Sequence, residues 1–197
     1  MKIISAELAV SATTLAQFPL EDLPEVAFLG RSNVGKSSVI NDLLGKGQVA
    51  FTSSTPGRTR QINFFRINRS FFFVDLPGYG YAKVVRTLRS VWEELIGGYL
   101  SGRRQLKVGI VIVDSRIGPT HQDLQRVGWL QQRPLPFFII STKADKLSRV
   151  ELQKSLKHTQ SLCMNVPVVV YSAVHGTGHD EVWARLQPYI SAKSSQS

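Results

Sequence analysis

A phosphate-binding loop is indicated by the spacing of one short stretch, Gly30-Arg31-Ser32-Asn33-Val34-Gly35-Lys36-Ser37. It satisfies the pattern G-x-x-x-x-G-K-[ST] and stands between an apolar run and a segment of helical periodicity, which is the setting that the pattern requires. Glycines let backbone N–H groups turn towards phosphate oxygens, and the helix that follows adds its partial positive charge. We expect Lys36 to reach the β- and γ-phosphates and the Ser37 hydroxyl to bind Mg²⁺. The alternative, a glycine turn that merely precedes a helix, is disfavoured by this setting.

A second group that faces phosphate is predicted in the run Asp75-Leu76-Pro77-Gly78. Asp75 ends an apolar segment, where its carboxylate would hold Mg²⁺ through a water. Gly78 would bring its backbone N–H to a γ-phosphate, which a side chain would obstruct. The next residue is Tyr79, at the position where many GTP-hydrolysing switches carry a glutamine that orients water. The sequence therefore raises the question of how hydrolysis is catalysed.

Selection of the base is predicted in the run Thr142-Lys143-Ala144-Asp145, which follows another apolar segment. The carboxylate of Asp145 can accept hydrogen bonds from N1–H and the exocyclic amine of guanine, whereas adenine offers neither donor, so discrimination of ~100-fold or better is expected. The stem of Lys143 can lie against the base. In isolation, Lys-x-x-Asp would instead suggest a salt-bridged surface loop. The backbone N–H groups that meet guanine O6 are expected from the run Tyr171-Ser172-Ala173-Val174. GTP is thus favoured over ATP.

The elements that must position these groups are read from short apolar runs that alternate with helical segments. The predicted strands are 25–29, 61–67, 70–75, 107–114, 136–141 and 167–171. The predicted helices are 36–44, 85–101, 121–132, 149–164 and 180–191. Segments 61–67 and 70–75 are joined too tightly for a crossover and should form an antiparallel hairpin. The prediction is a three-layer α/β fold with a six-stranded, mostly parallel sheet, one antiparallel strand and about five helices, with ligands beyond the carboxyl ends of the strands.

The composition predicts one domain and an anionic partner. A chain of 197 residues suits a single core, expected over residues 25–191, with an extension at 1–24 packed on or flanking it and a disordered tail at 192–197. The net charge of +10 favours nucleic acid first and a membrane surface second, against a role in solubility alone. No apolar run approaches the ~20 residues of a membrane span. The single cysteine, Cys163, and an N-terminus without a signal-peptide pattern predict a reducing cytoplasm.

With these motifs in order, the chain resembles the TRAFAC-class P-loop GTPases and, more closely, the EngB (YihA/YsxC) family of bacterial GTP-binding proteins. The resemblance rests on GRSNVGKSS, STPGRTRQINFF, DLPGYGYAKV, STKADKLSR and YSAVHGTG, and it spans Glu25 to Ile190. It implies a six-stranded GTPase domain, Mg²⁺-dependent GTP hydrolysis, a role in assembling the large (50S) ribosomal subunit, and a link to cell division and septation. It also matches Thr59 to the switch I threonine that binds Mg²⁺ and contacts the γ-phosphate. Thr142 departs from the asparagine common in GTPases at large, although the family accepts threonine.

The predicted site can be stated as three sets. Nucleotide contacts beyond those already named are predicted at Ser38, Gly57, Arg58, Arg60 and Gln61. The metal ligands are predicted at Ser37, Thr59 and Asp75. The catalytic set is predicted at Lys36, Thr59, Gly78 and Asn33.

Through the resemblance, Tyr79 in place of glutamine implies slow intrinsic hydrolysis of GTP. The negative charge on the phosphates in the transition state must then be neutralised by another group. One hypothesis is that Asn33 and switch I carbonyls hold K⁺ beside the phosphates. A competing hypothesis makes Arg58 or Arg60 an arginine finger supplied in cis. Both hypotheses remain open at the level of the sequence.

The predicted function is a monomeric GTPase that binds pre-ribosomal RNA and protein as an assembly checkpoint. The alternative is a cell-division scaffold that uses GTP only as a conformational ligand. A metabolic P-loop kinase is disfavoured because the sequence lacks an arginine-rich lid and an acceptor pocket. Two interpretations stay open for a group of basic and aromatic residues that follows the Asp75–Gly78 segment (switch II): an RNA-facing patch or a solvated helix face. The group consists of Tyr79, Tyr81, Lys83, Arg86 and Arg89.

Overall fold

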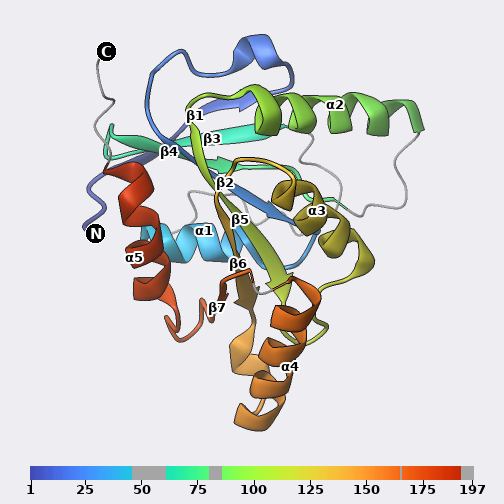
Figure 1. The fold of residues 1–197 in the computed structure, drawn as a ribbon. Helices are drawn as coiled ribbons and strands as arrows, with labels where there is room; N and C mark the ends of the chain where they lie inside the picture. The colour runs from blue at the N-terminus through green and yellow to red at the C-terminus, as the bar shows by residue number, and fades with distance from the viewer. Residues whose placement is uncertain (46–60, 80–85, 165, 192–197) are drawn as a thin grey trace.

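A seven-stranded sheet runs through the part of the chain that the computed structural model describes, namely residues 1–45, 61–79, 86–164 and 166–191, with backbone only for 86–93 (Figure 1). The strand order is β1-β3-β4-β2-β5-β6-β7. The strands are β1 (Ala6–Ala12), β2 (Glu25–Gly30), β3 (Ile62–Ile67), β4 (Phe71–Asp75), β5 (Leu106–Asp114), β6 (Phe137–Thr142) and β7 (Val168–Val170). The α-helices are α1 (Lys36–Leu44), α2 (Arg86–Gly102), α3 (His121–Gln131), α4 (Arg149–Leu162) and α5 (His179–Ile190). Short 3₁₀ turns lie at η1 (Leu15–Gln17) and η2 (Ala144–Lys146).

The predicted fold class is confirmed, with one strand more than expected. β3 is antiparallel to both of its neighbours, β1 and β4, and the other pairings are parallel, so β3 is the single antiparallel strand among those described. The seventh strand is β1, which the prediction of six strands missed. It lies at the edge of the sheet, with a bulge between Leu8 and Val10. Its side chains are exposed or half-buried except for Ala12, so they give none of the continuous apolar signal of the central strands.

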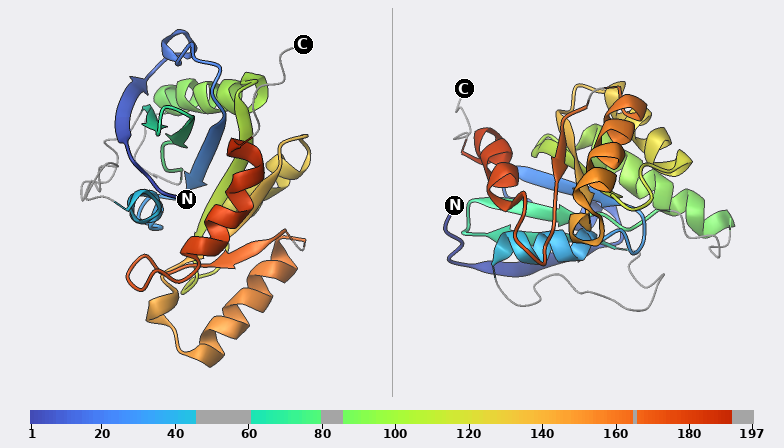
Figure 2. Two further views of the ribbon diagram at one scale, coloured as in Figure 1. Left: turned by 90° about the vertical axis from the view of Figure 1, so that its left-hand side faces the viewer. Right: turned by 90° about the horizontal axis from the view of Figure 1, so that it is seen from below.

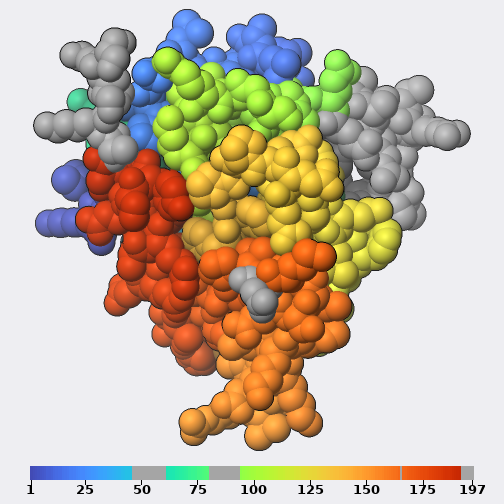
Figure 3. Space-filling model, in the orientation of Figure 1, coloured from blue at the N-terminus to red at the C-terminus, as the bar shows by residue number. Residues whose placement is uncertain are grey.

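Two apolar layers cover the sheet because successive residues of each strand point to opposite faces. On one face, Val26 and Phe28 of β2 share a core with α1 and α5, including Ile40 and Trp183. On the other face, Leu29 belongs to a core with residues of α2 and α3. The layers can be followed in Figures 1 and 2. Figure 3 shows α4 projecting from the body of the molecule. No helix in the described part of the chain has the length and apolar character of a bilayer span.

A buried charge ties the start of β2 to the end of α2. Glu25 is fully buried, and its carboxylate accepts hydrogen bonds from Arg103 (Nη2–Oε1 2.6 Å) and from the Tyr99 hydroxyl (3.0 Å). Arg103 also donates to the carbonyl of Pro19 at 2.7 Å, which fixes residues before β2. Burial raises the pKa of Glu25, although Arg103 and Tyr99 act in the opposite direction. This cluster anchors α2, the helix that follows the Gly78 segment in the chain.

Candidate nucleotide-binding site

The loop between β2 and α1 has the backbone of an anion cradle. Asn33 and Gly35 both have left-handed backbones, with φ of 64° and 100°. Such alternation turns successive N–H groups to one side of a loop. A Cβ on Gly30 would lie 2.8 Å from Val34 Cγ1 and 3.2 Å from the carbonyl oxygen of Ile112, so the start of the loop requires glycine. The strand–loop–helix setting predicted from the sequence is therefore present, with α1 beginning at Lys36.

Lys36 and Asp75 are brought together at the mouth of this cradle. The Lys36 ammonium donates to Asp75 Oδ1, and their side chains are only 10% and 8% exposed. Asp75 ends β4 and pairs in register with Phe28 of the neighbouring strand β2, which brings it to the same edge of the sheet as the loop. A carboxylate at Asp75 and a hydroxyl at Ser37 are the oxygen donors that Mg²⁺ prefers, so the residues present suit that ion.

The segment after β4 lies along the wall of the cradle. Tyr79 N–H donates to the carbonyl of Gly30 at 3.3 Å, and Ser32 N–H donates to the carbonyl of Tyr79 at 3.4 Å. A Cβ on Gly78 would lie 3.0 Å from both the backbone nitrogen and Oγ of Ser32, so glycine permits this close approach. The Tyr79 side chain is buried in the layer beneath α2 and α3, and its hydroxyl donates to Asp123 Oδ1 at 2.8 Å. Burial, and next the charge of Asp123, raise the pKa of Tyr79.

The loop after β6 is tied directly to the cradle. The Thr142 hydroxyl lies 2.7 Å from the carbonyl of Val34 and 3.0 Å from that of Val113. The Lys143 ammonium donates to the carbonyl of Asn33 and to Asp114 Oδ2, at 2.8 Å in both cases. Burial opposes the charge of Asp114, but hydrogen bonds from Arg116 and Lys143 outweigh it and hold the pKa at about 2, below the ordinary 3.8. The predicted base-binding and phosphate-binding loops therefore form one connected unit.

Asp145 lies at the other end of this unit, beside the loop after β7. Its Oδ1 accepts from the Ser172 hydroxyl at 2.8 Å, and Lys146 lies 3.3 Å from Oδ2. The hydrogen bond from Ser172 lowers the pKa of Asp145, so the carboxylate is held as an acceptor. Ala144 N–H donates to the carbonyl of Tyr171 at 3.1 Å, which joins the two loops through their backbones.

Three comparisons with known proteins bear on this arrangement. Residues 25–143 match a family described as "50S ribosome-binding GTPase". A curated relative from Anoxybacillus flavithermus, "Probable GTP-binding protein EngB", is 44% identical over 193 residues, covering 96% of this chain and 100% of the relative.

The chain belongs to the EngB family of GTPases.

Two solved structures share the fold of this EngB chain. One is a probable GTP-binding protein engB, with a TM-score of 0.69 and 19% identity, covering 86% of this chain and 99% of that one. The other is Era in complex with MgGDPNP and nucleotides 1506–1542 of 16S ribosomal RNA, with a TM-score of 0.71 and 21% identity, covering 89% and 59%. At these identities the likeness shows the fold.

Part of the predicted EngB site lies outside the described residues, and the contacts of several other predicted residues are described. Residues 57–60 are not described, so the roles of Arg58, Thr59 and Arg60 stay predictions. Residues 80–85 are not described either. Gln61 is described and exposed just before β3, and Ser38 lies in the first turn of α1. The Tyr171 hydroxyl donates to Asp42, so its side chain is engaged with α1. Ser172 N–H donates to the carbonyl of Thr177 at 3.0 Å, and Val174 is exposed.

Two acidic residues of the site escaped the sequence analysis. Asp114 ends β5 opposite Thr142 of β6, a position that the strand prediction could have singled out. Asp123 follows Thr120 by three residues, which is the spacing of a helix capping box. That spacing predicts a local role in α3 and gives no sign of the contacts with Tyr79 and Arg31.

Proposed function

We propose that this EngB chain binds GTP and GDP with Mg²⁺, hydrolyses GTP slowly, and acts as a molecular switch in assembly of the large ribosomal subunit. The observation that carries the nucleotide assignment is the link between the base loop and the phosphate loop through Lys143 and Thr142. That link joins the loop that carries Asp145 to the cradle at Gly30–Ser37, which supports binding of one ligand that contains both a purine and phosphates.

The cradle binds the phosphates through its backbone N–H groups and through Lys36. In the described structure the Lys36 ammonium is paired with Asp75, so nucleotide binding exchanges this partner for phosphate oxygens. The exchange frees the Asp75 carboxylate for a second cation. Mg²⁺ would be held by Ser37, Thr59 and Asp75, and when bound it neutralises charge that develops on the transferred phosphoryl group. Gly78 lies at the Ser32 side of the cradle and contributes its N–H to the γ-phosphate.

Base selection by Asp145 is tested by Asp145→Asn. The carboxylate accepts two hydrogen bonds from guanine, whereas the amide of asparagine would place a donor opposite one of the guanine donors. The variant should therefore lose ~100-fold or more in GDP affinity and gain affinity for xanthosine diphosphate, whose carbonyl replaces the guanine amine. Asp180→Asn is the matched control, because Asp180 is a fully exposed acid on α5. Calorimetric titration of both nucleotides measures the change. Unaltered GDP binding by Asp145→Asn would remove Asp145 from the base site.

The catalyst that replaces glutamine is proposed to be K⁺ held by Asn33 and switch I carbonyls. Turnover of GTP in KCl should then exceed turnover in NaCl, and the difference should vanish when the Asn33 side chain is removed. Because Asn33 has φ of 64°, Asn33→Gly removes the side chain without the backbone strain that Asn33→Ala adds. Equal rates in both salts would exclude the potassium role. Slower hydrolysis with unchanged GTP binding in Arg58→Ala or Arg60→Ala would instead favour the arginine finger.

The partner is proposed to be the precursor of the large ribosomal subunit, with the protein acting as a cytoplasmic monomer that normal cell division and septation require. Support comes from the net charge of +10, which favours polyanions, and from the family description "50S ribosome-binding GTPase". Sedimentation of lysate with a non-hydrolysable GTP analogue or with GDP tests this. Nucleotide-dependent association with the large subunit is expected. Binding to division proteins without ribosomes would favour the scaffold alternative.

A further inference from the structure

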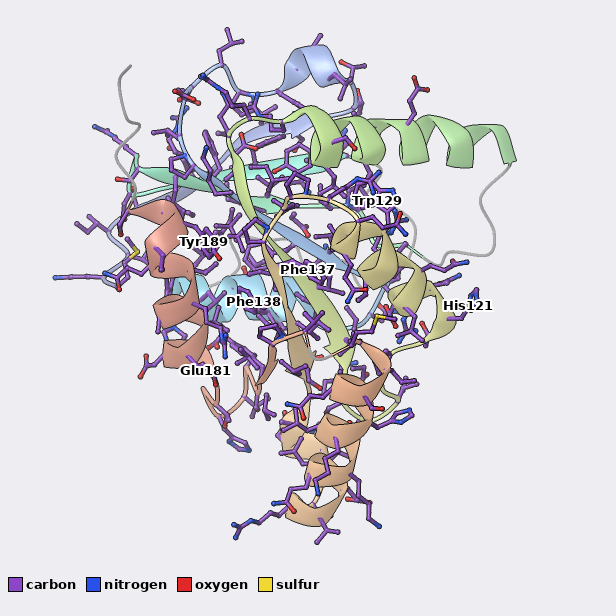
Figure 4. The ribbon with its side chains drawn as sticks, in the orientation of Figure 1. His121, Trp129, Phe137, Phe138, Glu181 and Tyr189 are labelled. Carbon is purple, nitrogen blue, oxygen red and sulfur yellow. The ribbon has the colours of Figure 1, made fainter. Side chains whose placement is uncertain are left out.

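One buried carboxylate gathers donors from three separate segments of the chain. Asp123 is fully buried in the first turn of α3, the helix that begins at the labelled His121 and carries the labelled Trp129 in its last turn (Figure 4). Its Oδ1 accepts from the Tyr79 hydroxyl at 2.8 Å, and its Oδ2 accepts from Arg31 Nε at 3.0 Å. Oδ2 also accepts from the backbone N–H and the hydroxyl of Thr120, at 2.8 and 2.7 Å. The phosphate loop, the segment after β4 and α3 therefore meet at one residue.

Helix capping alone does not account for this burial. The first turn of α4 has the same capping arrangement, in which Glu151 accepts from the backbone N–H and the hydroxyl of Ser148 at 2.8 and 2.7 Å. Glu151 is exposed, so a capping carboxylate in this protein can stay in solvent. A buried charge is unfavourable unless it is paired and hydrogen-bonded. The additional contacts with Arg31 and Tyr79 are what distinguish Asp123, and they point to a role outside α3.

The two side chains that reach Asp123 come from residues already joined through their backbones. Arg31 and Tyr79 form an isolated parallel bridge, with hydrogen bonds from Tyr79 N–H to Gly30 and from Ser32 N–H to Tyr79. The guanidinium of Arg126 lies 5.4 Å from the centre of the Tyr79 ring, on the same helix as Asp123. Tyr79 is thus fixed at its backbone, at its ring and at its hydroxyl. Gly78, the residue before it, is consequently fixed beside Ser32.

We propose that Asp123 is a positioning residue which, through Tyr79 and Arg31, holds the Gly78 N–H at the cradle and so favours GTP over GDP. The inference rests on the proposed function, in which Gly78 contacts the γ-phosphate. A segment held in its binding conformation before the ligand arrives loses less conformational freedom on binding. GDP has no γ-phosphate and makes no contact with Gly78, so its affinity does not depend on this restraint. A tyrosine suits this position because its ring fills the apolar layer while its hydroxyl reaches α3.

The test is the ratio of affinities for a non-hydrolysable GTP analogue and for GDP, measured by calorimetry with Mg²⁺ on the full chain. Tyr79→Phe removes only the hydroxyl, and Asp123→Asn keeps the shape of the side chain while removing its charge. Each should weaken the GTP analogue by about tenfold, the fold-change that corresponds to one hydrogen bond to a charged group. GDP affinity should change by less than about twofold. Glu151→Gln, which alters the equivalent capping residue of α4, is the control and should leave both affinities unchanged.

A purely structural role for Asp123 gives a different result. If Tyr79→Phe and Asp123→Asn weaken both nucleotides equally, or leave the ratio at the wild-type value, the positioning role is wrong. If Asp123→Asn does not fold, as judged by its thermal transition, Tyr79→Phe alone decides. The wild-type titration with GDP separates this inference from the proposed function. Failure of the wild type to bind GDP overturns both, whereas wild-type binding with an unchanged ratio in the variants overturns only the role of Asp123.

Discussion

The hydroxyl of Thr142 offers a sharp test of how the base loop supports the phosphate loop. Thr142 is 3% exposed, and its Oγ1 lies within hydrogen-bond distance of the carbonyls of Val34 and Val113. A hydroxyl carries one proton, so it donates to one of these carbonyls at a time. Thr142→Val removes that donor while keeping a branched side chain of the same shape beneath Gly35, where an added Cβ would lie 3.5–3.7 Å from Thr142 atoms.

The expected cost follows from one lost donor in a buried setting. A buried hydrogen bond contributes about 0.5–1.5 kcal/mol, and leaving an acceptor unsatisfied adds to that, so Thr142→Val should lower the free energy of unfolding by about 1–2 kcal/mol. For a domain of this size, each kcal/mol corresponds to about 2–4 °C in Tm. Because Val34 belongs to the cradle, GDP affinity should also fall. If the whole loss appeared in binding, the fall would be about 5–30-fold, and a smaller value is expected.

Urea unfolding and calorimetric titration with GDP measure the two effects, with Thr142→Ser as the matched variant. Serine keeps the hydroxyl and loses the methyl group, so it should lose some stability through packing and keep GDP affinity close to wild type. Equal loss of GDP affinity in Thr142→Ser and Thr142→Val would show that the methyl group, and not the hydroxyl, supports the cradle. A hydrogen-bonded link between the two loops would then be refuted as the source of nucleotide affinity.

Two further predictions concern buried charges. Arg103→Ala leaves the carboxylate of Glu25 buried without its cationic partner, so the free energy of unfolding should fall by about 3–5 kcal/mol in urea titrations, and a loss below about 1 kcal/mol would contradict the pairing. The pKa of Asp114 is lowered to about 2 from the ordinary 3.8, so its contribution to stability is complete above about pH 4 and is lost as the pH falls towards 2. The difference in Tm between wild type and Asp114→Asn should therefore shrink as the pH falls from about 4 towards 2, whereas a difference that does not vary with pH would argue against that shift.

Local motifs account for what the sequence predicted well. The spacing of Gly30, Gly35 and Lys36 predicts the phosphate-binding loop because the geometry of that loop depends on residues close together in the sequence. The long apolar run of β5 predicts a strand buried on both faces. The helix starts were predicted at the observed residue for α1, α3 and α4 and within one residue of it for α2 and α5. The edge strand β1 was missed because half-exposed side chains in a short segment carry a weak signal, and its pairing partner, β3, lies some fifty residues further along the chain.

The sequence by itself determined the fold class, the cradle, and the residue types suited to guanine recognition, because each depends on order and spacing within a few residues. Only the tertiary structure decided where Tyr79 points and which carboxylate receives it, since Asp123 lies 44 residues away. It also decided that Thr142 and Lys143 fasten the base loop to the phosphate loop across separations of 108 and 110 residues. Such contacts depend on which strands lie side by side in the folded sheet, and patterns within a short stretch of sequence do not predict that arrangement.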